Sequence, residues 1–196
     1  MHDAMRKNPL GTLVTAGSDG LQGDHVPFLL LPKEGSYGTL LCHLAKANRH
    51  LETLRSCGEA MVMFQGAHAY ISPSLYASKK VNGRVVPTWN YIAVHAWGEP
   101  TVIDDPKWLR EQVTALTDRH EAGRESRWHV SDAPSDFLDA QLKGIVGVQI
   151  IVKRLEGKWK VSQNRPAADS ATVAHALGSG GPREVEMAQH VTERSR

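Results

Sequence analysis

The sequence predicts an α+β fold, mainly β, in which an antiparallel sheet forms a barrel with helices at its periphery. Two observations support this fold class. Short segments rich in β-branched residues recur between Gly and Pro breaks along most of the chain. Helical periodicity is confined to a few stretches set between runs of strands, so strands and helices do not alternate regularly. The 196 residues, 41% hydrophobic and 22% charged, suffice for one domain with a sizeable core.

The strands are predicted from β-branched runs that end at turn-forming residues. We expect the chain to reverse or break at Gly66, at Glu99-Pro100 and at Glu156-Gly157, the last of these forming a hairpin turn. The predicted strands are 10–16, 26–31, 38–44, 60–64, 69–71, 90–98, 101–103, 147–155 and 158–162.

The clearest helix runs from Pro106 to about residue 120. Asp104 or Asp105 can cap it, and proline suits a first helical turn. Beyond residue 177 the composition changes to Gly-Ser-Gly-Gly-Pro and then to charged residues, which is typical of a flexible segment. We therefore predict a single domain over 1–177 and a flexible tail over 178–196. The remaining predicted helices are a short one that ends before Pro9, and 46–55, 135–143 and 166–177.

Charge and cysteine content limit the functional classes. The 23 Lys and Arg residues nearly balance the 21 Asp and Glu residues, and the net charge of +2 produces no overall field that would attract DNA or an anionic membrane. No apolar run approaches the roughly 20 residues that span a bilayer. Only Cys42 and Cys57 are present, without a CxxC pair. A reduced, cytoplasmic protein without a membrane segment is the simplest interpretation.

Common catalytic motifs are missing from the sequence. His120-Glu121 lacks the second histidine four residues after the first that a zinc protease needs, so we predict no metal site despite ten histidines. No Gly-x-Ser-x-Gly elbow, dinucleotide-binding glycine motif or Walker A sequence occurs. These absences argue against a metalloprotease, a serine hydrolase and the common nucleotide-binding folds.

Two stretches combine residue types that suit a phosphorylated ring. His43–His50 joins a predicted strand to a predicted helix, where free backbone N–H groups with Lys46 and Arg49 could hold a phosphate. A solvated helix with basic surface residues would give the same spacing. Val86–Tyr91 places a ring, an amide and a hydroxyl at the start of a strand, as a planar heterocycle requires. Trp89 could equally belong to the barrel core or its rim.

Two further stretches carry polar residues on one strand face. In Phe64–Pro73, the side chains of His68, Tyr70 and Ser72 alternate onto one face, which could be a pocket wall or the polar side of a hairpin. In Trp159–Arg165, residues 160, 162 and 164 share a face that suits an anion, although an exposed sheet edge shows the same pattern. His68 and His95 are the best titratable candidates for catalysis, and a structural role is favoured for both.

Together these stretches resemble the PaiB family of FMN-binding negative transcriptional regulators over roughly residues 6–177. Asp118-Arg-His-Glu121 and Val130-Ser-Asp-Ala-Pro134 fit the same pattern. Only seven residues precede Asn8, whereas PaiB-like chains usually carry a longer aromatic-rich start, so weaker flavin binding is expected if that start covers the groove. The phrases that carry the resemblance are Asn8-Pro-Leu-Gly-Thr-Leu-Val-Thr15, His43-Leu-Ala-Lys-Ala-Asn48, Phe64-Gln-Gly-Ala-His-Ala-Tyr-Ile-Ser-Pro73, Pro87-Thr-Trp-Asn-Tyr91 with Val94-His95, and Leu155-Glu-Gly-Lys-Trp-Lys160 with Ser162-Gln-Asn-Arg-Pro166.

The resemblance implies a Greek-key-like split β-barrel, related to pyridoxamine-phosphate oxidase and flavin reductase domains. It also implies a homodimer with FMN in the groove between the subunits. Either a regulator of transcription or a flavin-dependent reductase that uses NAD(P)H would fit, and contact with DNA follows from the family's description alone. The implied flavin-binding residues are Lys46, Asn48 and Arg49 at the phosphate, Thr88, Trp89 and Asn90 near the ring, and Ser162, Gln163 and Arg165 closing the groove from the partner subunit.

Overall fold

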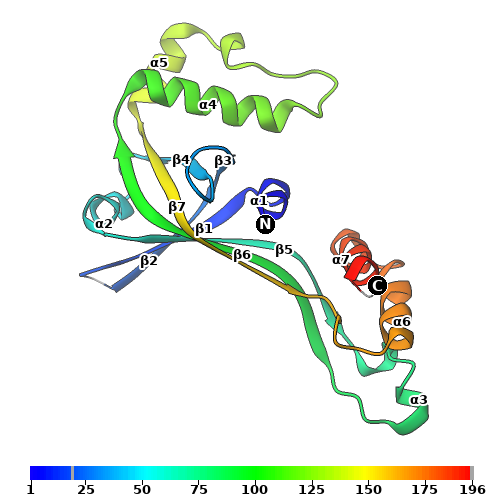
Figure 1. Ribbon diagram of the computed structural model, residues 1–196. Coiled ribbons are helices and arrows are strands. Elements are labelled where there is room, and N and C mark those ends of the chain that lie inside the picture. The colour runs from blue at the N-terminus through cyan, green and yellow to red at the C-terminus, as the bar shows by residue number, and fades with distance from the viewer. Residues whose placement is uncertain (19, 195–196) are drawn as a thin grey trace. The chain divides into compact units, whose positions relative to one another are not determined.

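A computed structural model gives the fold of the chain and describes residues 1–18 and 20–194 (Figure 1). Strands make up most of the regular structure near the N-terminus, and helices are concentrated toward the C-terminus. The elements are α1 (His2–Lys7), β1 (Leu10–Gly17), β2 (Gly20–Pro27), β3 (Leu29–Leu31), β4 (Thr39–Ala45), α2 (His50–Ser56), β5 (Ala60–Ile71), the 3-10 turn η1 (Pro73–Leu75), α3 (Lys79–Asn82), β6 (Thr88–Ile103), α4 (Pro106–Glu121), the 3-10 turn η2 (Val130–Asp132), α5 (Ser135–Lys143), β7 (Ile145–Lys160), α6 (Ala167–Leu177) and α7 (Pro182–Arg194).

The seven strands form one sheet in the order β2-β1-β5-β6-β7-β4-β3. The two outermost strands, β2 and β3, are consecutive in the chain and are separated only by Phe28. The sheet must therefore curl until its two ends meet, and β2 indeed lies against β4. The pairs β1–β2, β1–β5, β3–β4 and β4–β7 are all antiparallel. The predicted mainly-β fold with an antiparallel barrel is confirmed.

The chain divides into two compact units, which we call unit 1 and unit 2. Unit 1 comprises Met1–Phe64 and His95–Glu156, and unit 2 comprises Gln65–Val94 and the chain from Gly157 onward. Strands β5, β6 and β7 contribute residues to both. The boundary of a single domain at residue 177 stays a prediction.

The three breaks predicted inside β-rich segments do not occur. β5, β6 and β7 run without interruption through Gly66, Glu99-Pro100 and Glu156-Gly157. At Gly66 the alternation of buried residues shifts by one, because residues 60, 62 and 64 are buried before it and residues 67, 69 and 71 after it. Such a shift is typical of a glycine that redirects a strand, as at a β-bulge, and no reversal is needed. At Gly66, therefore, the glycine marks a shift within one strand and not a turn between two strands.

Close backbone approach explains one of the strand glycines. A Cβ atom at Gly98 in β6 would overlap the carbonyl oxygen of Ile151 in β7. Only glycine lets the two strands approach this closely. Gly98 therefore helps to keep β6 continuous just before Pro100.

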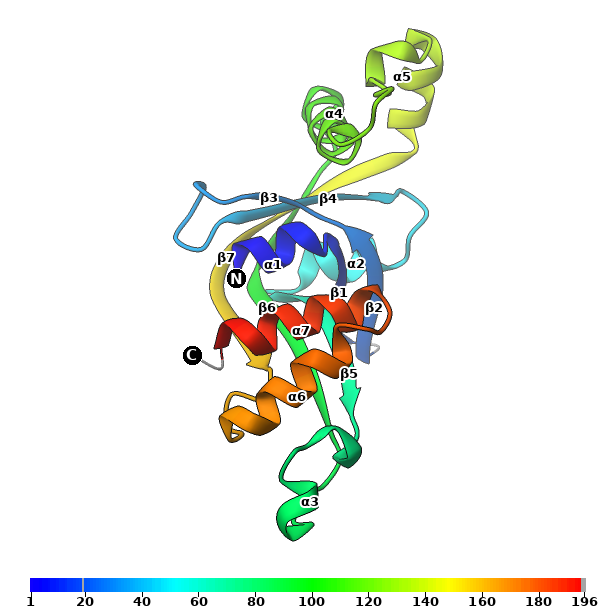
Figure 2. The ribbon, with the colours of Figure 1, turned by 90° about the vertical axis from the view of Figure 1, so that its right-hand side faces the viewer.

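The predicted flexible tail is a helix over most of its length. Helix α7 spans Pro182–Arg194 and packs on α6 (Figure 2). Met187 and Val191 are completely buried, so the apolar face of this helix is packed against other parts of the protein. The Gly-rich composition before Pro182 belongs to the connection between α6 and α7. The helical spacing of the apolar residues that follow it was therefore not taken into account in the prediction. Ser195 and Arg196, the end of the predicted tail, lie outside the described residues.

The other predicted helices are confirmed, with one shifted start. Helix α2 begins at His50, four residues after the predicted start, and the residues from Lys46 to Arg49 form a turn. Asp105 caps α4, since its Oδ1 accepts from the Trp108 N–H at 2.7 Å. Within the described residues, no helix is both long and apolar enough to span a bilayer.

Candidate functional site

The Lys46–Arg49 turn lies in unit 1 between β4 and α2. Lys46 is exposed, and its ammonium pairs with Asp104 Oδ1 at 2.9 Å. Arg49 is exposed at the start of α2. Helix α2 has only seven residues and begins after Lys46, so the expected phosphate site at a helix N-terminus is not present in that form. Lys46 and Arg49 provide exposed positive charge, but they are not part of a preformed phosphate-binding site.

Asn48 belongs to a hydrogen-bond network that ties the turn to the barrel. Its Nδ2 donates to Asp24 Oδ2 at 2.9 Å, and its Oδ1 accepts from the His50 N–H at 2.9 Å. The buried His50 ring joins the same carboxylate through Nδ1 at 2.9 Å and Thr15 Oγ1 through Nε2 at 2.6 Å. Asp24 Oδ2 accepts from the Nδ1–H, and Nε2 lies within hydrogen-bond distance of the Thr15 hydroxyl. Both polar groups of the Asn48 side chain are thus engaged within the protein.

The three predicted ring-binding residues lie on two faces of β6 in unit 2. Thr88 and Asn90 point to the more buried face, whereas Trp89 points to the exposed face, because successive side chains of a strand alternate. One flat ring bound to one face of this strand cannot contact all three. The structure therefore separates Trp89 from its two neighbours.

Lys160 and Ser162 join Thr88 and Asn90 on the more buried face. The Lys160 ammonium donates to Thr88 Oγ1 at 2.7 Å, and Asn90 Nδ2 donates to Ser162 Oγ at 2.9 Å. Within the described part of the chain, half-buried Lys160 has no carboxylate partner, and the buried Asn90 Oδ1 has no hydrogen-bond partner. A half-buried charge without a counter-ion and a buried acceptor without a donor are typical of a site that a polar ligand completes.

An exposed aromatic surface, which we call the Trp89 shelf, consists of His68, Tyr70 and Trp89. The His68 and Trp89 rings are nearly parallel, with their centroids 5.9 Å apart, and the Tyr70 ring lies 5.9 Å from Trp89 at a tilt of 53°. Arg183 of α7 reaches this surface, where its Nη1 lies 3.3 Å from His68 Nε2. No carboxylate pairs with Arg183 among the described residues. The shelf thus presents flat rings beside an uncompensated positive charge.

The loop after β7 holds its own conformation. Gln163 Oε1 accepts from the Val161 N–H and its Nε2 donates to the Trp159 carbonyl, both at 2.8 Å. Ser162 adopts a left-handed φ of 61°, which is uncommon for a residue other than glycine. The Arg165 guanidinium lies 4.5 Å from the centre of the Tyr76 ring. Gln163 is therefore engaged within the loop, whereas Arg165 contacts Tyr76 of the segment that follows η1.

Asp169 connects α6 to the segment that precedes α3. Its carboxylate accepts from the Ser78 N–H at 2.8 Å and from the Ser78 hydroxyl at 2.7 Å. Burial by itself raises the pKa of Asp169, but these hydrogen bonds and the charge of Arg165 outweigh it, and the pKa lies below its ordinary value. Asp169 is ionised at neutral pH and serves as a fixed structural acceptor.

The residues of unit 2 fit a phosphorylated planar ring better than the sequence alone indicated. The shelf provides a stacking surface, and Arg183 and Lys160 provide two cations that have no carboxylate partner in the described part of the chain. Sequence analysis pointed to His68, Tyr70 and Lys160 but did not place them among the flavin-binding residues. Arg183 was missed because its segment was predicted to be flexible, and no local signal links it to β5.

Comparisons with known proteins agree with this fold. A flavocytochrome Anf3 from Azotobacter vinelandii superposes with a TM-score of 0.57 at 13% identity, covering 81% of this chain and 67% of the other. An FAD and heme binding protein from Mycobacterium smegmatis superposes with a TM-score of 0.57 at 16% identity, covering 81% and 68%. At such low identity these likenesses show the fold alone. The fold is that of a split β-barrel, as the sequence predicts.

Sequence relatives show the family. Residues 1–154 match the family described as a "putative FMN-binding domain". The protease synthase and sporulation protein PAI 2 of Bacillus subtilis is 33% identical, covering 94% of this chain and 86% of the relative. An uncharacterized protein of Aspergillus fumigatus is 35% identical, covering 97% and 90%. The chain belongs to this FMN-binding family, and the resemblance to PaiB proteins is confirmed.

Proposed function

We propose that this protein is a homodimer that binds FMN, with the flavin ring on the Trp89 shelf. The observation that carries the proposal is the shelf itself, a set of aromatic rings beside the guanidinium of Arg183, which pairs with no carboxylate within residues 1–18 and 20–194. An isoalloxazine ring is flat and stacks on aromatic side chains, and its phosphate needs a cation nearby. FMN would supply the redox chemistry, whereas this chain's residues would bind and orient it.

The two faces of β6 support a site shared between two copies of the chain. Trp89 lies on one face, whereas Thr88, Asn90 and Lys160 lie toward the other. A single bound flavin would contact both sets only if one set came from each subunit. We propose that the ring stacks on Trp89 of one subunit, and that Arg183 of that subunit binds the phosphate together with Lys160 and Thr88 of the other subunit.

The predicted phosphate residues Lys46, Asn48 and Arg49 take a smaller part in this proposal. Asn48 is occupied by Asp24 and His50, and Lys46 is paired with Asp104. Arg49 is exposed and could add positive charge. Ser162, Gln163 and Arg165 shape the loop that follows Lys160, so we propose that they position the site.

Titration with FMN tests the shelf directly. Trp89→Ala should weaken FMN binding by about 5- to 150-fold, since stacking of a base on an aromatic side chain contributes about 1–3 kcal/mol. Trp128→Ala is the matched control, because Trp89 is 48% exposed and Trp128 is 47% exposed and lies outside the shelf. Flavin fluorescence quenching and the visible spectrum provide the readout. Equal affinity in both variants would show that the ring binds elsewhere.

Subunit mixing tests the shared site. Trp89→Ala and Lys160→Ala chains with different tags would be produced together, and the mixed dimers isolated. If each site takes Trp89 from one subunit and Lys160 from the other, one of the two sites in a mixed dimer has both residues intact and should bind FMN at full affinity. Failure to recover binding in a mixed dimer, or a monomer by light scattering, would contradict the proposal.

The use of the bound flavin is a separate question with two candidate answers. Regulation of transcription is supported by the resemblance to PaiB proteins, whereas a reductase role is supported by the redox chemistry of flavin. Oxidation of NADH or NADPH in the presence of FMN would favour the reductase. Retardation of DNA that weakens steeply with salt would favour direct regulation. A cytoplasmic location stays a prediction from the cysteine content.

A further inference from the structure

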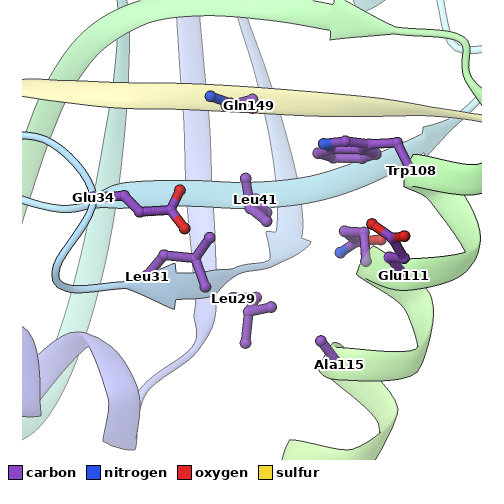
Figure 3. A pocket seen from close by; sticks show the side chains of 9 residues that line it. Leu29, Leu31, Glu34, Leu41, Trp108, Glu111, Ala115 and Gln149 are labelled. Carbon is purple, nitrogen blue, oxygen red and sulfur yellow. The ribbon is translucent and has the colours of Figure 1, made fainter.

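Unit 1 contains a cavity of about 270 Å³ between α4 and the strands β3, β4 and β7 (Figure 3). None of its lining residues is among those proposed to bind FMN. Figure 3 shows the Trp108 ring reaching from α4 toward the strands, and the Glu34 side chain reaching toward the same space from the β3–β4 connection. The cavity is lined by Leu29, Leu31, Glu34, Leu41, Trp108, Glu111, Gln112, Ala115 and Gln149.

The lining combines apolar walls with negative charge. Three leucines and the Trp108 ring form the apolar surface, and Glu34 and Glu111 bring carboxylates. No lysine, arginine or histidine lines the cavity, and within the described ranges neither carboxylate has a cationic partner. The charge of the two glutamates is therefore left for solvent or for a cationic ligand to compensate.

Gln112 provides an independent indication of a ligand. The residue is only 2% exposed although it lines the cavity. Its Oε1 lies 2.9 Å from His43 Nδ1, whereas its Nε2 has no hydrogen-bond partner among the described residues. A buried amide donor left unpaired costs free energy, and an acceptor group in the cavity would remove that cost.

The walls of the cavity are held in place without a ligand. Trp108 lies directly against Gly147 of β7, where any Cβ atom would overlap the indole ring. Leu116 of α4 packs with Leu29 and Leu41 in a buried cluster. A preformed site loses little conformational entropy when it binds a ligand.

We infer that this cavity binds a small aromatic or aliphatic amine that also carries a hydrogen-bond acceptor. The apolar walls receive the hydrocarbon body and the Trp108 ring contacts its face. Glu34 and Glu111 bind the ammonium group, and Gln112 Nε2 donates to the acceptor. Since a cavity of about 150 Å³ holds a benzene molecule, a volume of about 270 Å³ suits a substituted benzene.

Calorimetric titration with three probes of similar shape separates the contribution of the ammonium group from that of the hydrogen-bond acceptor. 4-Methoxybenzylamine carries both the ammonium and the acceptor, and a primary amine is protonated at pH 7. 4-Methoxybenzyl alcohol lacks the charge, and 4-ethylbenzylamine lacks the acceptor. We expect the first probe to bind most tightly and the uncharged alcohol to bind at least about tenfold more weakly. Equal affinities for the first two probes, or no binding of any probe, would overturn the inference.

Variants test the assigned residues. Glu34→Gln and Glu111→Gln should each weaken binding of 4-methoxybenzylamine while leaving binding of the alcohol unchanged. Both positions are exposed, so the fold should tolerate them, and the free energy of unfolding would confirm this. Glu99→Gln is the control, because Glu99 is exposed and pairs with Lys153 outside the cavity. An equal loss of affinity for 4-methoxybenzylamine in all three variants, or no loss in any of them, would contradict the inference. Whether or not FMN binds has no bearing on these outcomes.

Discussion

At the scale of single residues, the polar side chains near the predicted site divide into structural and available groups. Asp24, Asn48 and His50 satisfy one another, with Thr15 closing the network at His50 Nε2. Among the described residues, the Lys160 ammonium hydrogen-bonds to a hydroxyl and the Arg183 guanidinium to an imidazole, and neither pairs with a carboxylate. This difference in partners, which spacing along the chain does not reveal, changes the role that we assign to Asn48.

Asp24→Asn should destabilise the protein by about 1–2 kcal/mol, because the variant loses the charged acceptor shared by Asn48 and His50. The free energy of unfolding in urea gives the measurement. Asp139→Asn removes a carboxylate that pairs with Arg110 at the surface and should cost less than about 1 kcal/mol. Similar losses in the two variants would indicate that the Asp24 network contributes no more than a surface ion pair.

The lowered pKa of Asp169 predicts how its contribution to stability depends on pH. A carboxyl group with a lowered folded-state pKa stabilises the protein above its unfolded value of about 3.9 and loses this effect as the pH falls through the folded value. Wild type should therefore exceed Asp169→Asn by about 2 kcal/mol at about pH 7, and the difference should shrink below about pH 4. Asp136→Asn, which removes an exposed carboxylate of α5, is the comparison variant. A difference that stays constant with pH would rule out this explanation.

At the scale of secondary-structure elements, the largest departures from prediction concern continuity. Three strands pass through residues that normally break strands, and a helix forms in the segment expected to be flexible. In both cases the local residue types are compatible with a break, but packing against neighbouring elements favours continuity. Gly98 illustrates the point, since its missing side chain allows β6 to approach β7.

Met187→Ala tests whether α7 is a packed part of unit 2. Met187 is fully buried, and truncating a buried methionine typically costs about 2–5 kcal/mol. Gln189→Ala, at an exposed position of the same helix, should change stability by less than about 0.5 kcal/mol. Urea unfolding would compare the two. If Met187→Ala behaved like Gln189→Ala, the helix would have to be detached in solution.

At the scale of the whole molecule, chain order and sheet order together require the barrel. The outer strands β2 and β3 are neighbours in sequence, and this closure leaves the middle strands β5, β6 and β7 to extend into unit 2. Unit 2 carries the Trp89 shelf on these strands and Arg183 on α7. The proposed ring site thus depends on strands from the middle of the sequence and on the helix α7 near its C-terminus.

Binding of FMN should stabilise the whole protein by mass action. At a free FMN concentration about 100 times the Kd, the gain is about 2.7 kcal/mol, which corresponds to about 5–10 °C in Tm for a chain of this size. Differential scanning fluorimetry with and without FMN would measure the shift. Trp89→Ala should show a smaller shift at the same concentration, and riboflavin, which lacks the phosphate, should also be less effective. A Tm that does not respond to FMN would contradict the proposed binding.

The sequence by itself determined the fold class, most helices and the family, because these depend on local periodicity and on long phrases of residues. It also drew attention to Trp89, Asn90 and Ser162. Only the tertiary structure decided that Trp89 and Asn90 lie on opposite faces of β6, that Asn48 is occupied by Asp24, and that Arg183 meets His68. These relations depend on which segments pack together, and residues 115 positions apart in the chain become neighbours only when the sheet and helices are assembled.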